Sequence, residues 1–75
     1  MTDHAAGSRL SDAELIGQGR SIIYRSSAPT DPTLMREQLE ILREWVSRHR
    51  FVSPADWVEM SIARLLIEEL GIAVD

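Results

Sequence analysis

The segment from residue 54 to residue 70 carries more apolar surface than a helix on a small domain requires. On a helical wheel its apolar side chains spread over roughly 220°, whereas a surface helix needs an apolar stripe of about 100°. A helix with so wide an apolar face must pack against neighbours on more than one side. The arc comprises Val58, Met60, Ile62, Ala63, Leu65, Leu66, Ile67 and Leu70.

The chain has 75 residues, which is enough for one small domain, and it contains no cysteine. Disulfides, cysteine-based zinc sites and thiol catalysis are therefore excluded. No apolar run approaches the ~20 residues of a membrane span and no signal peptide opens the chain, so we expect a cytoplasmic protein without membrane association. Domains of this size are only marginally stable alone, which favours an oligomer.

The formal net charge is −4, and all eight basic residues are arginines. The lack of lysine excludes Schiff-base chemistry on a side-chain amine and a Walker-type phosphate loop. Codon bias in a GC-rich genome is the simplest cause of this arginine usage. An acidic chain also makes nucleic-acid binding unlikely, because domains with that function usually carry a basic face.

The first helix is marked by a capping box. Ser11 is followed three residues later by Glu14, so each side chain can bond a free backbone N–H at the helix start. Leu10 and Leu15 flank the box at the spacing of a hydrophobic staple. These signals predict a helix over about residues 11–25.

Two glycines lower the helix propensity of this first segment. Gly17 and Gly19 each cost about 1 kcal/mol relative to alanine in a helix interior. Because Gly19 lies within the apolar stripe, we expect either a close helix crossing there or a kink. Residues 22–24 could alternatively form a short strand. Residues 1–10 are predicted to be a disordered tail, and residues 11–75 to be the domain.

The second helix should begin with Asp31 as N-cap and Pro32 at the first helical position, and should run over about residues 32–49. Its apolar residues follow 4-3-4-3 spacing, which is typical of a coiled-coil-like seam. Trp45 lies at the edge of that seam. The seam comprises Met35, Leu39, Leu42, Val46 and His49.

A second capping motif starts the third helix, with Ser53 followed by Asp56 where glutamate or glutamine is usual. Gly71 can take the left-handed conformation that ends a helix, so we predict a helix over about residues 54–70. The connection between the second and third helices is short, which favours an antiparallel pair. The sequence therefore predicts an all-α domain of three helices, with helices two and three antiparallel.

We expect the third helix to bind protein. Its wide apolar face indicates a non-enzymatic interaction module, either a homodimer or an accessory subunit, adaptor or inhibitor of a larger protein. The pattern favours a core role for Trp45 and a staple that covers Val52 for Trp57, although tryptophans at the margin of an apolar face also suit an interface. The predicted interface comprises Trp45, Trp57, Met60, Ala63, Leu66, Ile67 and Leu70.

The alternative is a DNA-associated transcriptional regulator that uses a basic cluster at the end of helix two. Arg43, Arg48 and Arg50 make up that cluster, which would otherwise be a solvated helix cap. As the second helix of a helix-turn-helix, however, the third helix would present Arg64 as its single basic residue. The chemistry is therefore wrong for reading bases.

The sequence indicates neither a catalytic site nor a cofactor. It contains no spacing typical of a nucleophile, base and acid, and no glycine-rich phosphate loop. His49 lies in the apolar seam, but no other histidine, aspartate or glutamate shares its spacing. We therefore expect no metal site, and expect His49 to be stabilised by the helix dipole.

Overall fold

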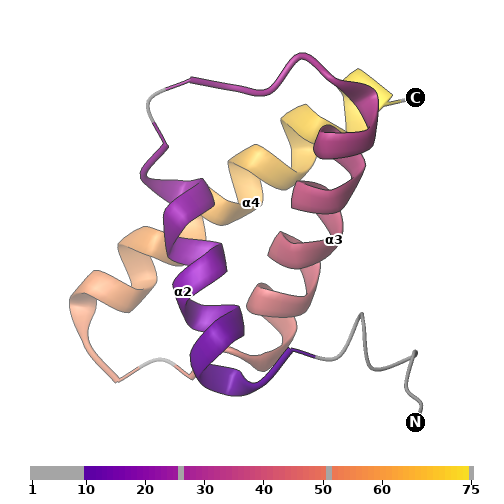
Figure 1. Cartoon of the computed structure of the whole chain (residues 1–75). Coiled ribbons are helices and arrows are strands. Elements are labelled where there is room, and N and C mark those ends of the chain that lie inside the picture. Colours follow the sequence, from indigo (N-terminus) through magenta and orange to yellow (C-terminus); the bar gives the residue numbers. More distant parts are fainter. Residues whose placement is uncertain (1–9, 26, 51, 75) are drawn as a thin grey trace, which may run out of the picture.

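The computed structural model describes residues 10–25, 27–50 and 52–74, and the regular structure within them is entirely helical. The helices are α2 (Asp12–Ile23), α3 (Pro32–Arg48) and α4 (Pro54–Val74) (Figure 1). The predicted three-helix, all-α fold is therefore confirmed, and residues 22 and 23 belong to a helix. Apart from Leu10, the predicted tail lies outside the described residues.

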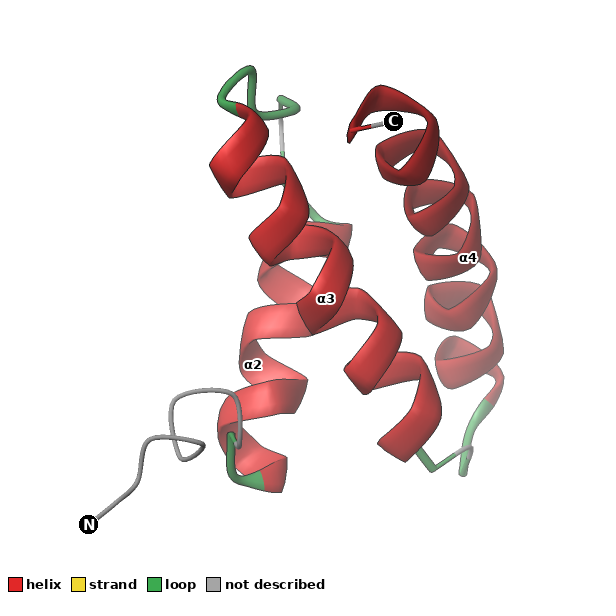
Figure 2. Cartoon of the chain, turned by 90° about the vertical axis from the view of Figure 1, so that its right-hand side faces the viewer, coloured by secondary structure: helices red, strands yellow, loops and turns green. Residues whose placement is uncertain are grey.

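The helices alternate in direction along the chain. α3 and α4 pack as an antiparallel pair, as predicted, and α2 lies across them (Figure 1). Viewed from the side, α2 and α3 both lie on the same side of α4 (Figure 2). The other side of α4 is consequently left without a covering helix among the described residues. None of the three helices combines the length and apolar character that a transmembrane helix requires.

Two predicted N-caps are present. The Ser11 hydroxyl accepts a hydrogen bond from the Glu14 backbone N–H at 3.2 Å, and the Glu14 carboxylate accepts one from the Ser11 N–H at 3.1 Å. At the start of α3, the Asp31 carboxylate accepts from the Thr33 N–H at 2.8 Å, beside Pro32. Each cap satisfies backbone donors that a helix leaves free at its first turn.

Trp45 lies at the centre of the core, where its side chain is fully buried. The core role that the sequence favours for Trp45 is therefore confirmed, and its assignment to the interface is wrong. The absence of a side chain at Gly19 makes this placement possible, because a Cβ atom there would overlap the indole ring. The close approach predicted at Gly19 is thus confirmed. The other buried core residues are Leu15, Ile22, Ile23, Leu39, Leu42, Met60, Ala63 and Leu70.

The end of α4 differs from the prediction. The helix continues through Gly71 to Val74, and no described glycine has a positive φ. Val74, in the last turn of the helix, packs against the core cluster. Tertiary packing thus outweighs the helix-propensity cost of about 1 kcal/mol for one glycine.

Candidate functional site

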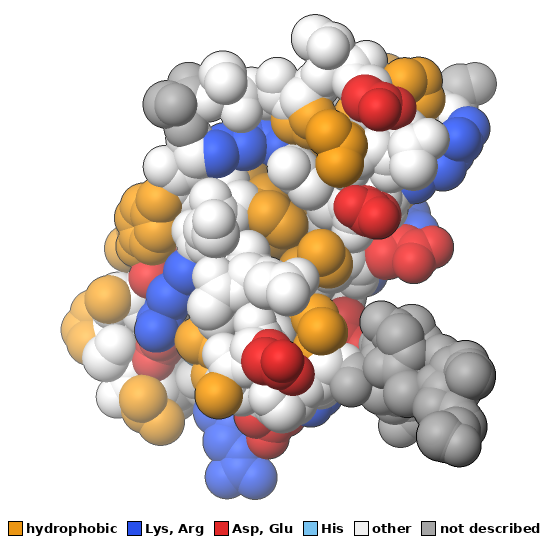
Figure 3. Space-filling view, in the orientation of Figure 1, with side chains coloured by type: hydrophobic (Ala, Val, Ile, Leu, Met, Phe, Trp, Pro, Cys, Tyr) orange, Lys and Arg blue, Asp and Glu red, His pale blue; other side chains and the backbone are white. Residues whose placement is uncertain are grey.

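Large apolar side chains are exposed along the outer side of α4. Trp57, Val58, Leu65 and Ile72 are 60%, 59%, 60% and 73% exposed. Val58, Leu65 and Ile72 are separated by seven residues each, so they form one line along the helix. Hydrophobic atoms also lie at the surface over the N-terminal turns of α4 (Figure 3). Of the seven large hydrophobic side chains that are exposed among the described residues, four therefore lie on α4.

Between these residues the helix places two further positions on the same line. Ile62 is half-buried and Glu69 is exposed, and together they complete a 4-3-4-3 pattern from residue 58 to residue 72. We call this set, Val58, Ile62, Leu65, Glu69 and Ile72, the outer stripe. Such spacing is typical of a helix surface that packs along a second helix.

The structure places four of the seven predicted interface residues inside the domain. Trp45, Met60, Ala63 and Leu70 are all buried. That part of the prediction is wrong, because Met60, Ala63 and Leu70 lie on the edge of the apolar arc of α4 that contacts the other helices, and Trp45 of α3 lies in the core. Of the remaining predicted residues, Leu66 and Ile67 are half-buried and pack against the core, whereas Trp57 is exposed.

Trp57 does not form a closed staple with Val52. Both side chains border a shallow hollow beside Pro54, yet Val52 is 86% exposed. A staple would shield the two side chains from water. The predicted staple is therefore wrong, and both residues add apolar surface at the start of α4.

In the first turns of α4, charged side chains face the domain and apolar side chains face water, which is the reverse of an ordinary amphipathic helix. Asp56 and Glu59 are buried, with 4% and 6% of their surface exposed, whereas Trp57 and Val58 between them face outward. An amphipathic surface helix normally turns its apolar side to the core and its charged side to water. The inversion requires that the domain supply partners for two buried carboxylates.

Those partners form a buried polar cluster with the two carboxylates. Glu59 accepts hydrogen bonds from the Tyr24 hydroxyl at 2.6 Å and from Arg20 Nε at 3.1 Å. A nitrogen of the Arg20 guanidinium also lies 3.7 Å from Asp56. Asp56 further lies 3.1 Å from His49 Nε2, and the His49 ring stacks on the Trp45 indole with centroids 4.3 Å apart.

Asp56 also holds the turn between α3 and α4. One of its carboxylate oxygens accepts from the backbone N–H groups of Val52, at 2.8 Å, and Ser53, at 2.9 Å. The Ser53 hydroxyl donates to the same oxygen at 3.2 Å. The predicted role of Asp56 in capping is thus present, but the serine hydroxyl points to the carboxylate and bonds no helix N–H that the structure records.

These hydrogen bonds shift the pKa values of three side chains in the cluster. The bond from Tyr24 and the charge of Arg20 lower the pKa of Glu59 below its ordinary value of 4.5. Bonds from the Val52 and Ser53 N–H groups and from His49 lower the pKa of Asp56 below 3.8. The same bond to Glu59 raises the pKa of the Tyr24 hydroxyl above 10.0. Both carboxylates are therefore ionised at neutral pH.

Ligand atoms of His49, Asp56 and Glu59 lie within 4.8 Å of one another, which is close enough to consider a metal ion. No spacing within one helix indicates this grouping, because His49 caps the end of α3 whereas Asp56 and Glu59 lie on α4. The positive charge that an ion would supply is already supplied by Arg20, which contacts both carboxylates. We therefore assign the cluster a structural role, which is to fasten α2 and the α3–α4 turn onto α4.

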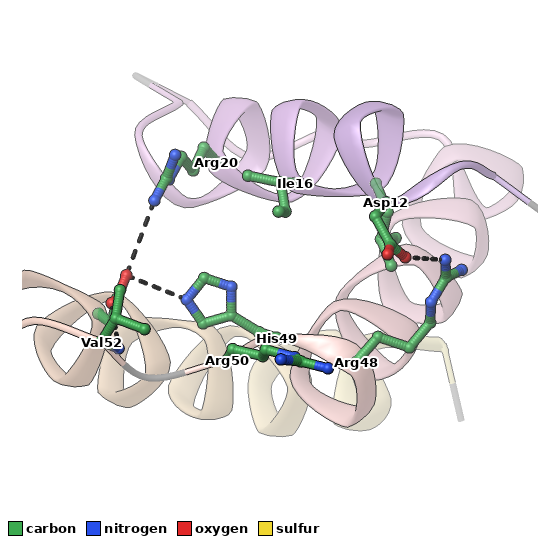
Figure 4. Close-up of a pocket in the computed structure, with 9 residues that line it drawn as sticks. Asp12, Ile16, Arg20, Arg48, His49, Arg50 and Val52 are labelled. Atoms are coloured by element: carbon green, nitrogen blue, oxygen red, sulfur yellow. Dashed lines mark hydrogen bonds and ion pairs between the residues drawn. The ribbon is translucent and has the colours of Figure 1, made fainter.

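A cavity of about 300 Å³ lies beside this cluster, between α2 and the end of α3. Ile16 of α2 faces His49 and Arg50 across it (Figure 4). Its lining mixes apolar, cationic and acidic groups, and its charged groups largely pair with one another. The lining residues are Asp12, Leu15, Ile16, Arg20, Arg48, His49, Arg50, Val52 and Asp56.

The basic cluster predicted at the end of α3 is not a uniform patch. Arg48 bonds Asp12, lies 3.1 Å from Glu44, and donates to the Leu10 carbonyl at 3.0 Å. These acidic partners raise the pKa of Arg48 and offset its charge. Arg43 and Arg50 are exposed, so two of the three arginines remain directed to solvent.

No protein-family model, curated protein or solved structure matches the chain.

Proposed function

We propose that this protein is an association module that binds a helix of another polypeptide along the outer stripe of α4. The observation that carries the proposal is the inversion at the start of α4. Buried carboxylates face the domain there, while Trp57 and Val58 face water. A partner that covered the outward side would bury these two apolar side chains, as an amphipathic helix ordinarily buries its apolar side.

The energetics favour such a contact. Burial of one large aliphatic or aromatic side chain contributes about 1.5–3 kcal/mol relative to its exposure. Val58, Leu65 and Ile72 are each more than half exposed, and they lie on one line. The flanking Trp57 fits the margin of a protein interface, where its indole can contact apolar and polar groups together.

A regulator that binds DNA through Arg43, Arg48 and Arg50 is less well supported. Phosphate binding needs cationic groups that are free to replace counterions. Arg48 is engaged by Asp12 and Glu44, so two arginines of this cluster are left for contact with a polyanion. The chain as a whole carries a net charge of −4, which opposes that contact.

The test is photo-crosslinking in the source cells with a photoreactive residue at position 65. The matched control carries the same residue at Leu34, which is 47% exposed and lies on α3. We expect covalent adducts with protein, of any identity, from position 65 and none from position 34. Absence of adducts at position 65, or equal yields at both positions, would contradict the proposal.

A further inference from the structure

The outer stripe has a symmetry that points to its partner. Val58 and Ile72 lie seven residues on either side of Leu65, and all three are exposed. We propose that the partner is a second copy of this chain, paired α4 to α4 in antiparallel orientation, with the two-fold axis at Leu65. This inference rests on the proposed function and specifies the partner of the same surface.

An antiparallel two-fold pairing matches the three exposed apolar positions with one another and leaves the half-buried Ile62 level with Glu68 of the second copy. It places Leu65 against Leu65 of the second copy, and Val58 against Ile72 of the second copy at each end. A two-fold interface uses the same patch on both molecules, so a self-complementary stripe is the feature that it requires. From residue 58 to residue 72 the contact would extend over about 21 Å of helix.

The charges on α4 select the antiparallel orientation over the parallel one. In a parallel pair, Glu69 would face Glu69 of the second copy within the apolar seam, and Glu68 would lie beside it. Like charges at such positions disfavour a pairing. In the antiparallel pair, the two copies of Glu69 instead lie about 12 Å apart along the helices, on either side of the axis.

The flanking charges are also complementary in the antiparallel pair. Arg64 and Glu68 lie on the same edge of the outer stripe, both exposed, one turn apart. A two-fold axis at Leu65 brings Arg64 of one copy close to Glu68 of the other, on both sides of the axis. Opposite charges at the margins of a helix pair fix its orientation and its partner.

Sedimentation equilibrium tests the choice of partner. We expect the wild-type chain to be a dimer at about 100 µM and to dissociate on dilution, because one helix pair is a small interface. Leu65→Glu should be monomeric, with unchanged far-UV circular dichroism because Leu65 is exposed in the single chain. Leu34→Glu, the same change at an exposed leucine on α3, should remain dimeric.

A wild-type monomer at that concentration would overturn the inference. If position 65 still gave adducts with another protein, the proposed function would stand with a different partner. If neither dimer nor adduct were found, both proposals would be wrong. A dimer that Leu65→Glu and Leu34→Glu left equally intact would place the interface elsewhere and would also overturn the inference.

The orientation is tested separately with single cysteines, because the chain contains none of its own. Leu65→Cys should form a disulfide-linked dimer on mild oxidation in either orientation. Val58→Cys alone should not, since the two copies of residue 58 lie about 21 Å apart along an antiparallel pair. A mixture of Val58→Cys and Ile72→Cys chains should give the mixed disulfide. Rapid self-linking of Val58→Cys would overturn the antiparallel arrangement.

Discussion

The inner side of α4 contains buried charged groups, whereas its outer side contains exposed apolar groups. On the inner side, Asp56 and Glu59 are buried, and each is held by several hydrogen bonds. On the outer side, Val58 and Leu65 are apolar and exposed. A charge inside a small domain persists only when donors surround it. The described residues therefore supply partners for the charges of the inner side, whereas they leave the outer side exposed to solvent.

The largest expected difference between the two sides comes from one substitution made at two leucines. Leu42→Ala should lower the free energy of unfolding by about 2–5 kcal/mol, because Leu42 is fully buried and its loss leaves a cavity. Leu65→Ala, on the outer side, should lower it by about 0.5 kcal/mol or less in the monomer. Urea denaturation at low protein concentration measures both. Equal effects would mean that the outer side is covered within the single chain.

A second pair of variants tests the packing behind the inner side. Gly19→Ala should destabilise the domain by about 1–3 kcal/mol, because the new methyl group would overlap the buried Trp45 ring. Gly17→Ala, on the same helix, should stabilise it by about 0.5–1 kcal/mol, since nothing lies near that position and alanine favours a helix. Thermal denaturation gives both values. A neutral Gly19→Ala would place Trp45 elsewhere.

The lowered pKa values of the two inner carboxylates predict how the free energy of unfolding depends on pH. The pKa values of Asp56 and Glu59 are lowered in the folded state from 3.8 and 4.5. The stability that they contribute is present above those ordinary values and is lost as the pH falls through the lowered pKa values. We expect a constant unfolding free energy between about pH 7 and pH 5 and a fall at lower pH. A chain equally stable at pH 2 and pH 7 would contradict the assigned cluster.

The smallest expected effect concerns Tyr24, whose side chain lies at the margin of the cluster. Tyr24→Phe removes the hydroxyl that donates to Glu59, so the pKa of Glu59 should rise toward its ordinary value. Acid unfolding should then begin at a higher pH than in the wild type. At the alkaline end, the wild type should lose stability as the pH rises through the raised pKa of Tyr24, and the variant should lose less. Identical pH profiles would exclude the Tyr24–Glu59 bond.

The sequence predicted the features that depend on neighbouring residues. Ser11 with Glu14, and Asp31 with Thr33, are separated by at most one helical turn, so their hydrogen bonds follow from the local backbone alone. The same reasoning located the three helices and the need for close packing at Gly19. It failed at Gly71, where packing of Val74 extends the helix.

The tertiary structure decided which side of α4 faces the domain. The wheel gave a wide apolar arc without indicating which edge contacts α2 and α3, so Met60 and Leu70 were assigned to a surface on which they do not lie. The buried cluster joins Arg20 and Tyr24 to Glu59 across 39 and 35 residues. No periodicity records such pairs, because they depend on how the helices cross. The local chemistry of the chain determines its helices, and the crossing of the helices determines which apolar residues stay exposed.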